Sequence, residues 1–165
     1  MGVMYFPGET PNDNKSLNSK NILGNLISSV VERSRGAEIN SISIDKNVRK
    51  IVDGIGVSGF VVHTDFTISN CKGKNCELLV FFYRKNFESA IKGKSSGYLS
   101  TNGSACVYQS FDVPYECSRW RDYSLFMPYG QLVGYNDDLI SCVVMIRDEH
   151  NKDLARKDIL NIKYR

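Results

Sequence analysis

The segment from Gly59 to Tyr83 constrains the fold most, because it contains two consecutive strand-like stretches. In the first stretch an apolar or β-branched residue recurs at every second position, which is the period of a strand with one buried face. These residues are Phe60, Val62, Thr64, Phe66 and Ile68. The second stretch, Leu78 to Tyr83, is apolar on both faces, as in a central strand of a covered sheet. Because Lys, Gly and Asn separate the stretches, we expect residues 56–70 and 76–85 to pair antiparallel as a hairpin joined at 72–75, with Phe66 and Val80 in the core.

Further strand-like stretches occupy most of the chain after residue 37. Asp53-Gly54 and Gly56 predict a turn into the hairpin, and the polar residues 85–103 predict a loop or a short edge strand around Tyr98. The other strands are expected at Glu38 to Asp45, Ala105 to Val113, Tyr123 to Met127, Leu139 to Ile146 and Ile159 to Tyr164. About seven or eight short strands separated by turn signals predict an all-β fold, namely a two-sheet antiparallel β-sandwich that is immunoglobulin-like or C2-like.

The N-terminal part has a different pattern. Residues 1–18 form a polar leader rich in turn-forming residues, and residues 19–35 have apolar side chains at helical spacing. Ser19 can cap the start of this helix and Gly36 can end it. The apolar stripe predicts an N-terminal α-helix that docks on its own sheet, or alternatively serves as an interface for another chain. We therefore expect a leader and helix over 1–36, a β-sandwich domain over 37–165, and a monomer or weak homo-oligomer.

Composition and charge exclude several classes of protein. The 165 residues are 42% hydrophobic and 24% charged, which suits one domain with a sizeable core. A net charge of +3 is too small to indicate nucleic acid as a partner. No stretch supplies the roughly 20 apolar residues of a membrane span, and the start lacks the features of an export signal. The expected compartment is the cytoplasm.

No catalytic or cofactor motif stands out, so we expect neither an enzyme nor a bound cofactor. The five cysteines are an odd number, which fits reduced, mostly buried thiols better than a disulfide framework. Cys71 and Cys76 flank the predicted hairpin turn, but a structural zinc site needs four ligands. His63 and Asp65 share a strand face, where a surface hydrogen bond is commoner than an acid–base site. An enzyme with a cysteine-based site is the third choice.

Carboxylates in predicted turns leave a second function open. Calcium-binding sandwiches of the C2 type gather carboxylates in loops at one end of the sheets. Asp122, Asp137 and Asp138 are the candidates, although their spacing shows no dedicated calcium loop. The alternative function is therefore a calcium- or lipid-dependent adaptor.

An aromatic and basic segment is the better candidate for binding. Tyrosine, tryptophan and arginine dominate the energetic hot spots of protein interfaces. The candidate surface consists of Tyr115, Arg119, Trp120, Arg121, Tyr129 and Tyr135. In the competing interpretation, Trp120 and Tyr123 fill the core with their polar tips at its rim. If the segment is a surface, its partner is a protein or a glycan.

Several segments of the chain also resemble a known domain. They are Ala37 to Val48, the stretches 63–74, 77–83, 102–108 and 121–132, and the closing residues 148–164. In this order they resemble an uncharacterised β-sandwich domain of Bacteroidetes proteins, often found after tetratricopeptide repeats, zinc ribbons or signalling-type catalytic domains. The most specific part is Asp122 to Tyr129 followed by Leu132. The resemblance implies a non-enzymatic accessory or recognition module, with residues 1–36 in place of a larger neighbouring domain.

Overall fold

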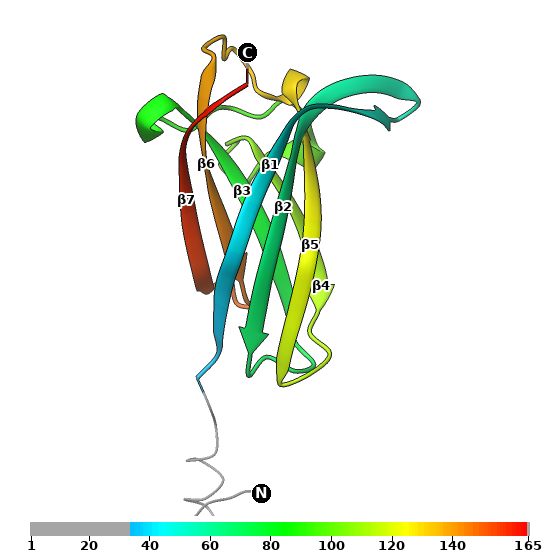
Figure 1. The fold of residues 1–165 in the computed structure, drawn as a ribbon, viewed down its shortest axis with the longest axis vertical. Coiled ribbons are helices and arrows are strands. Elements are labelled where there is room, and N and C mark those ends of the chain that lie inside the picture. The colour runs from blue at the N-terminus through cyan, green and yellow to red at the C-terminus, as the bar shows by residue number, and fades with distance from the viewer. Residues whose placement is uncertain (1–33, 165) are drawn as a thin grey trace, which may run out of the picture. The chain divides into compact units, whose positions relative to one another are not determined.

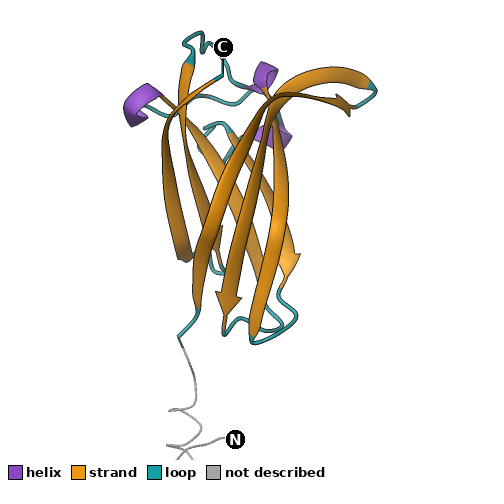
Figure 2. Cartoon of the chain, viewed as in Figure 1, coloured by secondary structure: helices purple, strands orange, loops and turns teal. Residues whose placement is uncertain are grey.

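The computed structural model of the protein describes residues 34–164. This part of the chain consists almost entirely of strands and their connections, with three single-turn 3-10 helices (Figure 2). The strands are β1 (Gly36–Val52), β2 (Ile55–Ser69), β3 (Asn75–Arg84), β4 (Cys106–Asp112), β5 (Cys117–Pro128), β6 (Leu139–Arg147) and β7 (Asp153–Lys163). The 3-10 helices are η1 (Lys85–Phe87), η2 (Ser96–Tyr98) and η3 (Tyr129–Gln131).

The seven strands form two antiparallel sheets that face each other (Figure 1). One sheet has the order β1-β2-β5 and the other the order β4-β3-β6-β7. The inward side chains of both sheets make one apolar core, which includes Phe66 of β2 and Val80 of β3, both fully buried. The predicted all-β, two-sheet architecture and these two core positions are confirmed.

The expected pairing of residues 56–70 with 76–85 is wrong. Both segments are strands, but β2 pairs with β1 and β5, whereas β3 pairs with β4 and β6. The residues between them cross from one sheet to the other, helped by left-handed backbone at Asn70 (φ 62°) and Gly73 (φ 76°). Lys, Gly and Asn suit a crossing between sheets as well as a hairpin turn, so the local pattern predicts strands without fixing their partners.

The hairpin that does form joins β1 to β2. Its two-residue turn is Asp53-Gly54, and both residues have positive φ (50° and 81°), as the turns of tight hairpins require. The turn was predicted, but β1 is much longer than the expected strand from Glu38 to Asp45. Likewise β5 begins at Cys117 and β7 at Asp153, well before the predicted starts. Backbone hydrogen bonds between strands extend these strands over polar, exposed residues, and such residues show no apolar alternation from which a strand could be predicted.

The connection between β3 and β4 contains no strand at Tyr98, which lies in η2. The isolated bridge between Ala90 and Tyr83 of β3 ties this connection to the four-stranded sheet. The predicted helix over 19–35 falls almost wholly outside the described residues. Ser34 and Arg35 lie in no helix, and Gly36 begins β1 instead of ending a helix.

Thr64 carries a stability prediction. It faces the core from β2, is fully buried, and its hydroxyl has no hydrogen-bond partner within the described chain. A buried hydroxyl that has lost water without gaining a partner costs free energy. We expect Thr64→Val to raise the free energy of unfolding by about 1 kcal/mol, measured by chemical denaturation. Thr67→Val is the control, because the Thr67 hydroxyl donates to Asn40 at 3.1 Å on the exposed face. A lower midpoint for Thr64→Val than for the natural protein would contradict the prediction.

Candidate functional site

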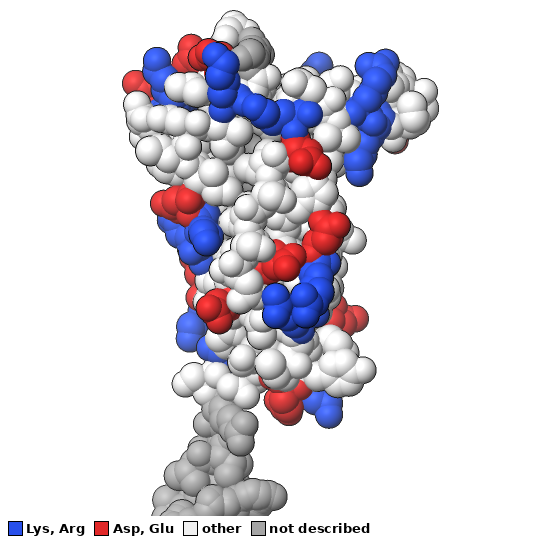
Figure 3. Space-filling view, viewed as in Figure 1, with Lys and Arg blue, Asp and Glu red and all other residues white. Residues whose placement is uncertain are grey.

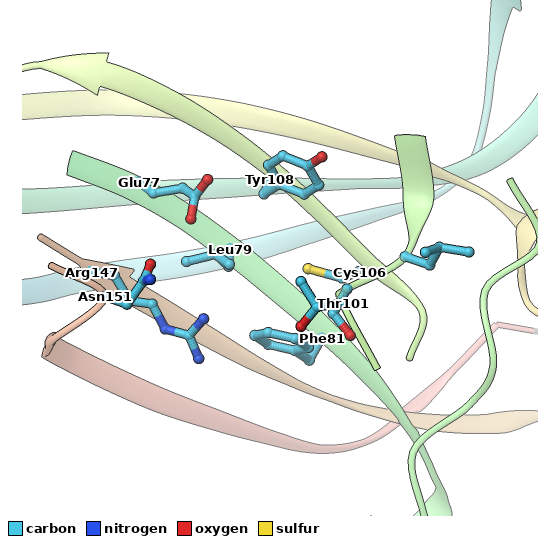
Figure 4. Close-up of a pocket in the computed structure, with 10 residues that line it drawn as sticks. Glu77, Leu79, Phe81, Thr101, Cys106, Tyr108, Arg147 and Asn151 are labelled. Atoms are coloured by element: carbon cyan, nitrogen blue, oxygen red, sulfur yellow. The ribbon is translucent and has the colours of Figure 1, made fainter. Parts of the chain in front are cut away.

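A groove lies on the outer face of the four-stranded sheet and has a volume of about 500 Å³. Its lining comes from β3, β4 and β6 and from the β3–β4 and β6–β7 connections (Figure 4). The lining residues are Glu77, Leu79, Phe81, Leu99, Ser100, Thr101, Cys106, Tyr108, Arg147 and Asn151. Strands far apart in the chain thus build one concave surface, which the sequence analysis did not predict.

The floor of the groove is apolar because of the cross-strand register. Leu79 lies opposite Tyr108, and Phe81 lies opposite Cys106 on one side and Val143 on the other. Residues directly opposite each other on antiparallel strands point to the same face of the sheet. β3 therefore has an apolar side chain at every position from Leu78 to Tyr83: alternate residues enter the core, and the others form the floor. The fully apolar strand was the available sequence signal for this second face.

One end of the groove carries two opposite charges that do not pair with each other. Glu77 and Arg147 are cross-strand partners, yet in the described structure they form no ion pair. Arg147 donates from Nε to Asp153 at 2.9 Å, and its guanidinium carbon lies 5.6 Å from the centre of the Phe81 ring. Among residues 34–164, the only hydrogen bond that the Glu77 carboxylate accepts is a long one of 3.5 Å from the Ser110 hydroxyl. A ligand can therefore meet a carboxylate, a guanidinium and an apolar floor within one groove.

Four of the five cysteines are buried thiols. Burial raises the pKa of Cys106, in the groove floor, to about 12, and it does the same for Cys76 and Cys142. Burial also raises the pKa of Cys71. Such thiols stay protonated at neutral pH, and the thiolate is the nucleophilic form. These four cysteines are free and buried, whereas the fifth, Cys117, is free and exposed.

A separate polar cluster surrounds His63 on the outer face of the three-stranded sheet. The Nδ1 atom of His63 lies 2.5 Å from Oδ1 of Asp122 and 3.0 Å from Oγ of Ser124. Its Nε2 atom lies 3.1 Å from Oδ2 of Asp45. Asp65, the residue expected to hydrogen-bond with His63, instead accepts a 2.7 Å hydrogen bond from the backbone N–H of Asp122.

The cluster fits a structural role better than catalysis. Asp122 has left-handed backbone (φ 52°) beside a β-bulge in the β2–β5 ladder, and its contact with His63 holds that bend. A serine nucleophile needs a ring nitrogen free to accept its proton. Here Asp122 is closer to Nδ1 than Ser124 is, so that nitrogen is already engaged by a carboxylate.

The predicted aromatic and basic surface is split by β5. Tyr115 is 68% exposed before the start of β5, and Arg119 and Arg121 are exposed on its first half. Trp120, between these arginines, packs against the core and stacks on Phe66 with ring centres 5.1 Å apart. The structure brings three of the predicted residues to one exposed region and turns Trp120 inward.

The other two predicted residues lie beyond the opposite end of β5. Tyr135 is buried, and its ring stacks 6.4 Å from that of Tyr164. Tyr129 is partly buried, packs on Phe60, and its hydroxyl binds Asn47. Tyr129 and Tyr135 therefore belong to the packing of that end and do not join Tyr115.

The calcium candidates are also separated. Asp122 lies within β5 against His63, while Asp137 and Asp138 lie in the β5–β6 connection, where Asp138 pairs with Lys163 at 3.3 Å. Within residues 34–164 no group of three or more His, Cys, Asp or Glu side chains is placed to hold a metal ion.

No protein-family model matches this chain, and a comparison with curated proteins finds no similar sequence. Between Ser34 and Tyr164, no helix is long and apolar enough to cross a membrane. The groove and its register are thus the strongest guide to function.

Proposed function

We propose that the chain is a non-catalytic recognition module that binds an exposed polypeptide segment of a partner protein in the groove. One observation carries this proposal: Glu77 and Arg147 lie beside an apolar floor and form no ion pair with each other in the described structure. Ligand sites are mostly apolar with a few polar groups that fix orientation, and this groove has that composition. An apolar side chain of the ligand would lie on Leu79 and Phe81, while its charged groups meet Glu77 and Arg147.

Tyr108 is the expected anchor on the protein side. It is 43% exposed at the side of the groove, and tyrosine is enriched among the residues that dominate binding energy. Among the described strands, β4, which carries Tyr108, pairs only with β3, so its other edge is open within this part of the chain. An extended peptide that follows this edge could reach both the apolar floor and the charged end.

The strand order supports an immunoglobulin-like form of the sandwich. The order β1-β2-β5 against β4-β3-β6-β7 corresponds to an immunoglobulin-like arrangement in which the fourth strand lies beside the third, as strand C′ does in variable-type domains. Many recognition domains share this architecture, but architecture alone does not assign a function. The resemblance to accessory domains of Bacteroidetes proteins agrees with the same proposal. A C2-like adaptor remains the alternative.

The experiment selects peptides from a random display library on the immobilised protein and measures their affinity for groove variants. We expect Tyr108→Ala to weaken the selected peptides at least about tenfold, or ~1.4 kcal/mol. Tyr115→Ala is the matched control, because Tyr115 is an exposed tyrosine in the β4–β5 connection, away from the groove lining. It should leave the affinity unchanged.

Charge variants test the same site independently. Glu77→Gln should weaken the binding of selected peptides that contain a basic residue. Arg147→Gln should weaken the binding of those that contain an acidic residue. If the selected peptides bound every groove variant as tightly as they bind the natural protein, the groove would not be the site. Binding to a glycan array that is lost with Tyr108→Ala would assign the groove to sugars instead of peptides.

A further inference from the structure

The β1–β2 hairpin extends beyond the body of the sandwich, on a different part of the surface from the groove. β2 pairs with β5 only from Gly59 onward, so residues 55–58 pair with β1 alone. Figure 1 shows this ribbon bending away from the two sheets at one end. We call residues 46–58 the arm.

Specific contacts build the bend at the base of the arm. The β1–β2 register shifts between Asp45 and Val48, and Asn47 within this bulge has left-handed backbone (φ 57°). The Tyr129 hydroxyl accepts a 2.7 Å hydrogen bond from the backbone N–H of Asn47 and donates to its Oδ1 at 3.2 Å. Bulges redirect strands and are often functional features, so the projection of the arm is a built element of the fold.

The tip of the arm exposes apolar side chains on both of its faces. Ile51 and Ile55 are 72% and 66% exposed, and they are the most exposed large aliphatic residues of the described chain. Ile51 lies opposite Gly56, and Ile55 lies opposite Val52. Residues at neighbouring register positions point to opposite faces of a ribbon. Apolar side chains on both faces of the tip are exposed to solvent, and such a tip is suited to insertion into an apolar environment.

Basic residues lie behind this tip and over the adjoining end of the sandwich. The arm contains three basic residues, Lys46, Arg49 and Lys50, and one acidic residue, Asp53. At the same end of the sandwich, the connections between strands and the neighbouring strand ends carry Arg84, Lys85, Lys92, Lys94 and Lys163 against Glu88, Asp137 and Asp138. Figure 3 shows Lys and Arg side chains on the arm and across this end. Val133, in the β5–β6 connection, adds another exposed apolar side chain.

We propose that the arm docks the protein on an anionic lipid bilayer, with Ile51 and Ile55 in the interfacial layer and the lysines and arginines against the headgroups. Peripheral binding strength comes from buried apolar area together with attraction of basic residues to anionic lipid, and the arm combines both. A soluble polyanion would use the basic residues but not the isoleucines. Asp53 at the apex of the arm limits how deeply the arm can insert into the bilayer, since its carboxylate has to stay near water.

The test is sedimentation of the full chain with vesicles of phosphatidylcholine alone or with about 30% phosphatidylserine. We expect binding to the anionic vesicles only, and weaker binding at about 0.5 M than at about 0.1 M salt. The double substitution Ile51→Ser with Ile55→Ser should weaken binding at least tenfold. Leu160→Ser is the matched control, because Leu160 is 58% exposed on β7, outside the arm, and binding should not change. Asp53→Asn should strengthen binding, and asparagine tolerates the left-handed turn position.

Several results would overturn this proposal. One is the absence of binding to anionic vesicles at low salt. Another is binding that Lys46→Gln weakens while the double isoleucine variant does not, which would indicate adsorption of charge without insertion. Equal binding to a DNA duplex, insensitive to the isoleucines, would indicate a polyanion surface. A natural protein that is dimeric, ignores vesicles and becomes monomeric in the double variant would assign the arm to a second copy of the chain.

Discussion

Replacing Phe66 with alanine is expected to lower the free energy of unfolding by about 3 to 5 kcal/mol. Phe66 is fully buried on β2. Its ring centre lies 5.5 Å from that of Phe111, 5.1 Å from that of Trp120 and 5.7 Å from that of Tyr123. Truncation removes the apolar area of one ring and leaves a cavity among three others. The loss is large beside the 5 to 15 kcal/mol that a typical domain has in total.

Guanidinium unfolding, followed by tryptophan fluorescence, measures this loss, since Trp120 stacks on Phe66. Tyr115→Ala is the control, because the 68% exposed Tyr115 ring contributes little packing, and the change should stay within about 0.5 kcal/mol. If Phe66→Ala unfolded at the same denaturant concentration as the natural protein, the ring cluster would not be part of the core.

The success of the Phe66 assignment shows which features are readable from local sequence. Alternation in β2 places its inward residues, and the continuous apolar runs of β3 and β6 mark central strands, as both are in the sheet order. Asp53-Gly54 marks a tight turn through its left-handed preference. Each of these follows from the side chains of one stretch and its period, without reference to a partner strand.

Strand partners and sites depend on contacts between distant stretches, which a single sequence does not encode locally. β2 and β3 lie in different sheets instead of pairing, although their spacing suits a hairpin. Glu77, Tyr108 and Arg147 meet in the groove only because β4, β3 and β6 are neighbours. The prediction that the aromatic and basic residues share one surface failed for a related reason. Inward and outward positions alternate along β5, so Trp120 packs against the core while Arg119 and Arg121 are exposed.

Gly59 is the position where the smallest substitution should have a large effect. It lies in β2 opposite Pro128 of β5, where the two backbones approach closely. A Cβ atom at Gly59 would collide with the carbonyl oxygen of Met127 and lie 2.8 Å from its carbonyl carbon and from the Cα of Pro128. These are backbone atoms, so no flexible side chain can move aside. Glycine within a strand often marks such an approach.

We therefore expect Gly59→Ala to separate β2 from β5 and to lower the free energy of unfolding by about 3 kcal/mol, the upper part of the range for overpacking. Chemical denaturation measures it, with Gly130→Ala as control, because a Cβ atom at Gly130 meets no atom within 4 Å. The control should change stability by less than about 0.5 kcal/mol. The end of the β2–β5 ladder at Gly59 gives a second readout. Hydrogen exchange of the amides of residues 59–62 should accelerate in Gly59→Ala, because the β2–β5 ladder opens from its Gly59 end. Equal midpoints and equal exchange in both variants would mean that β2 and β5 do not approach this closely at Gly59.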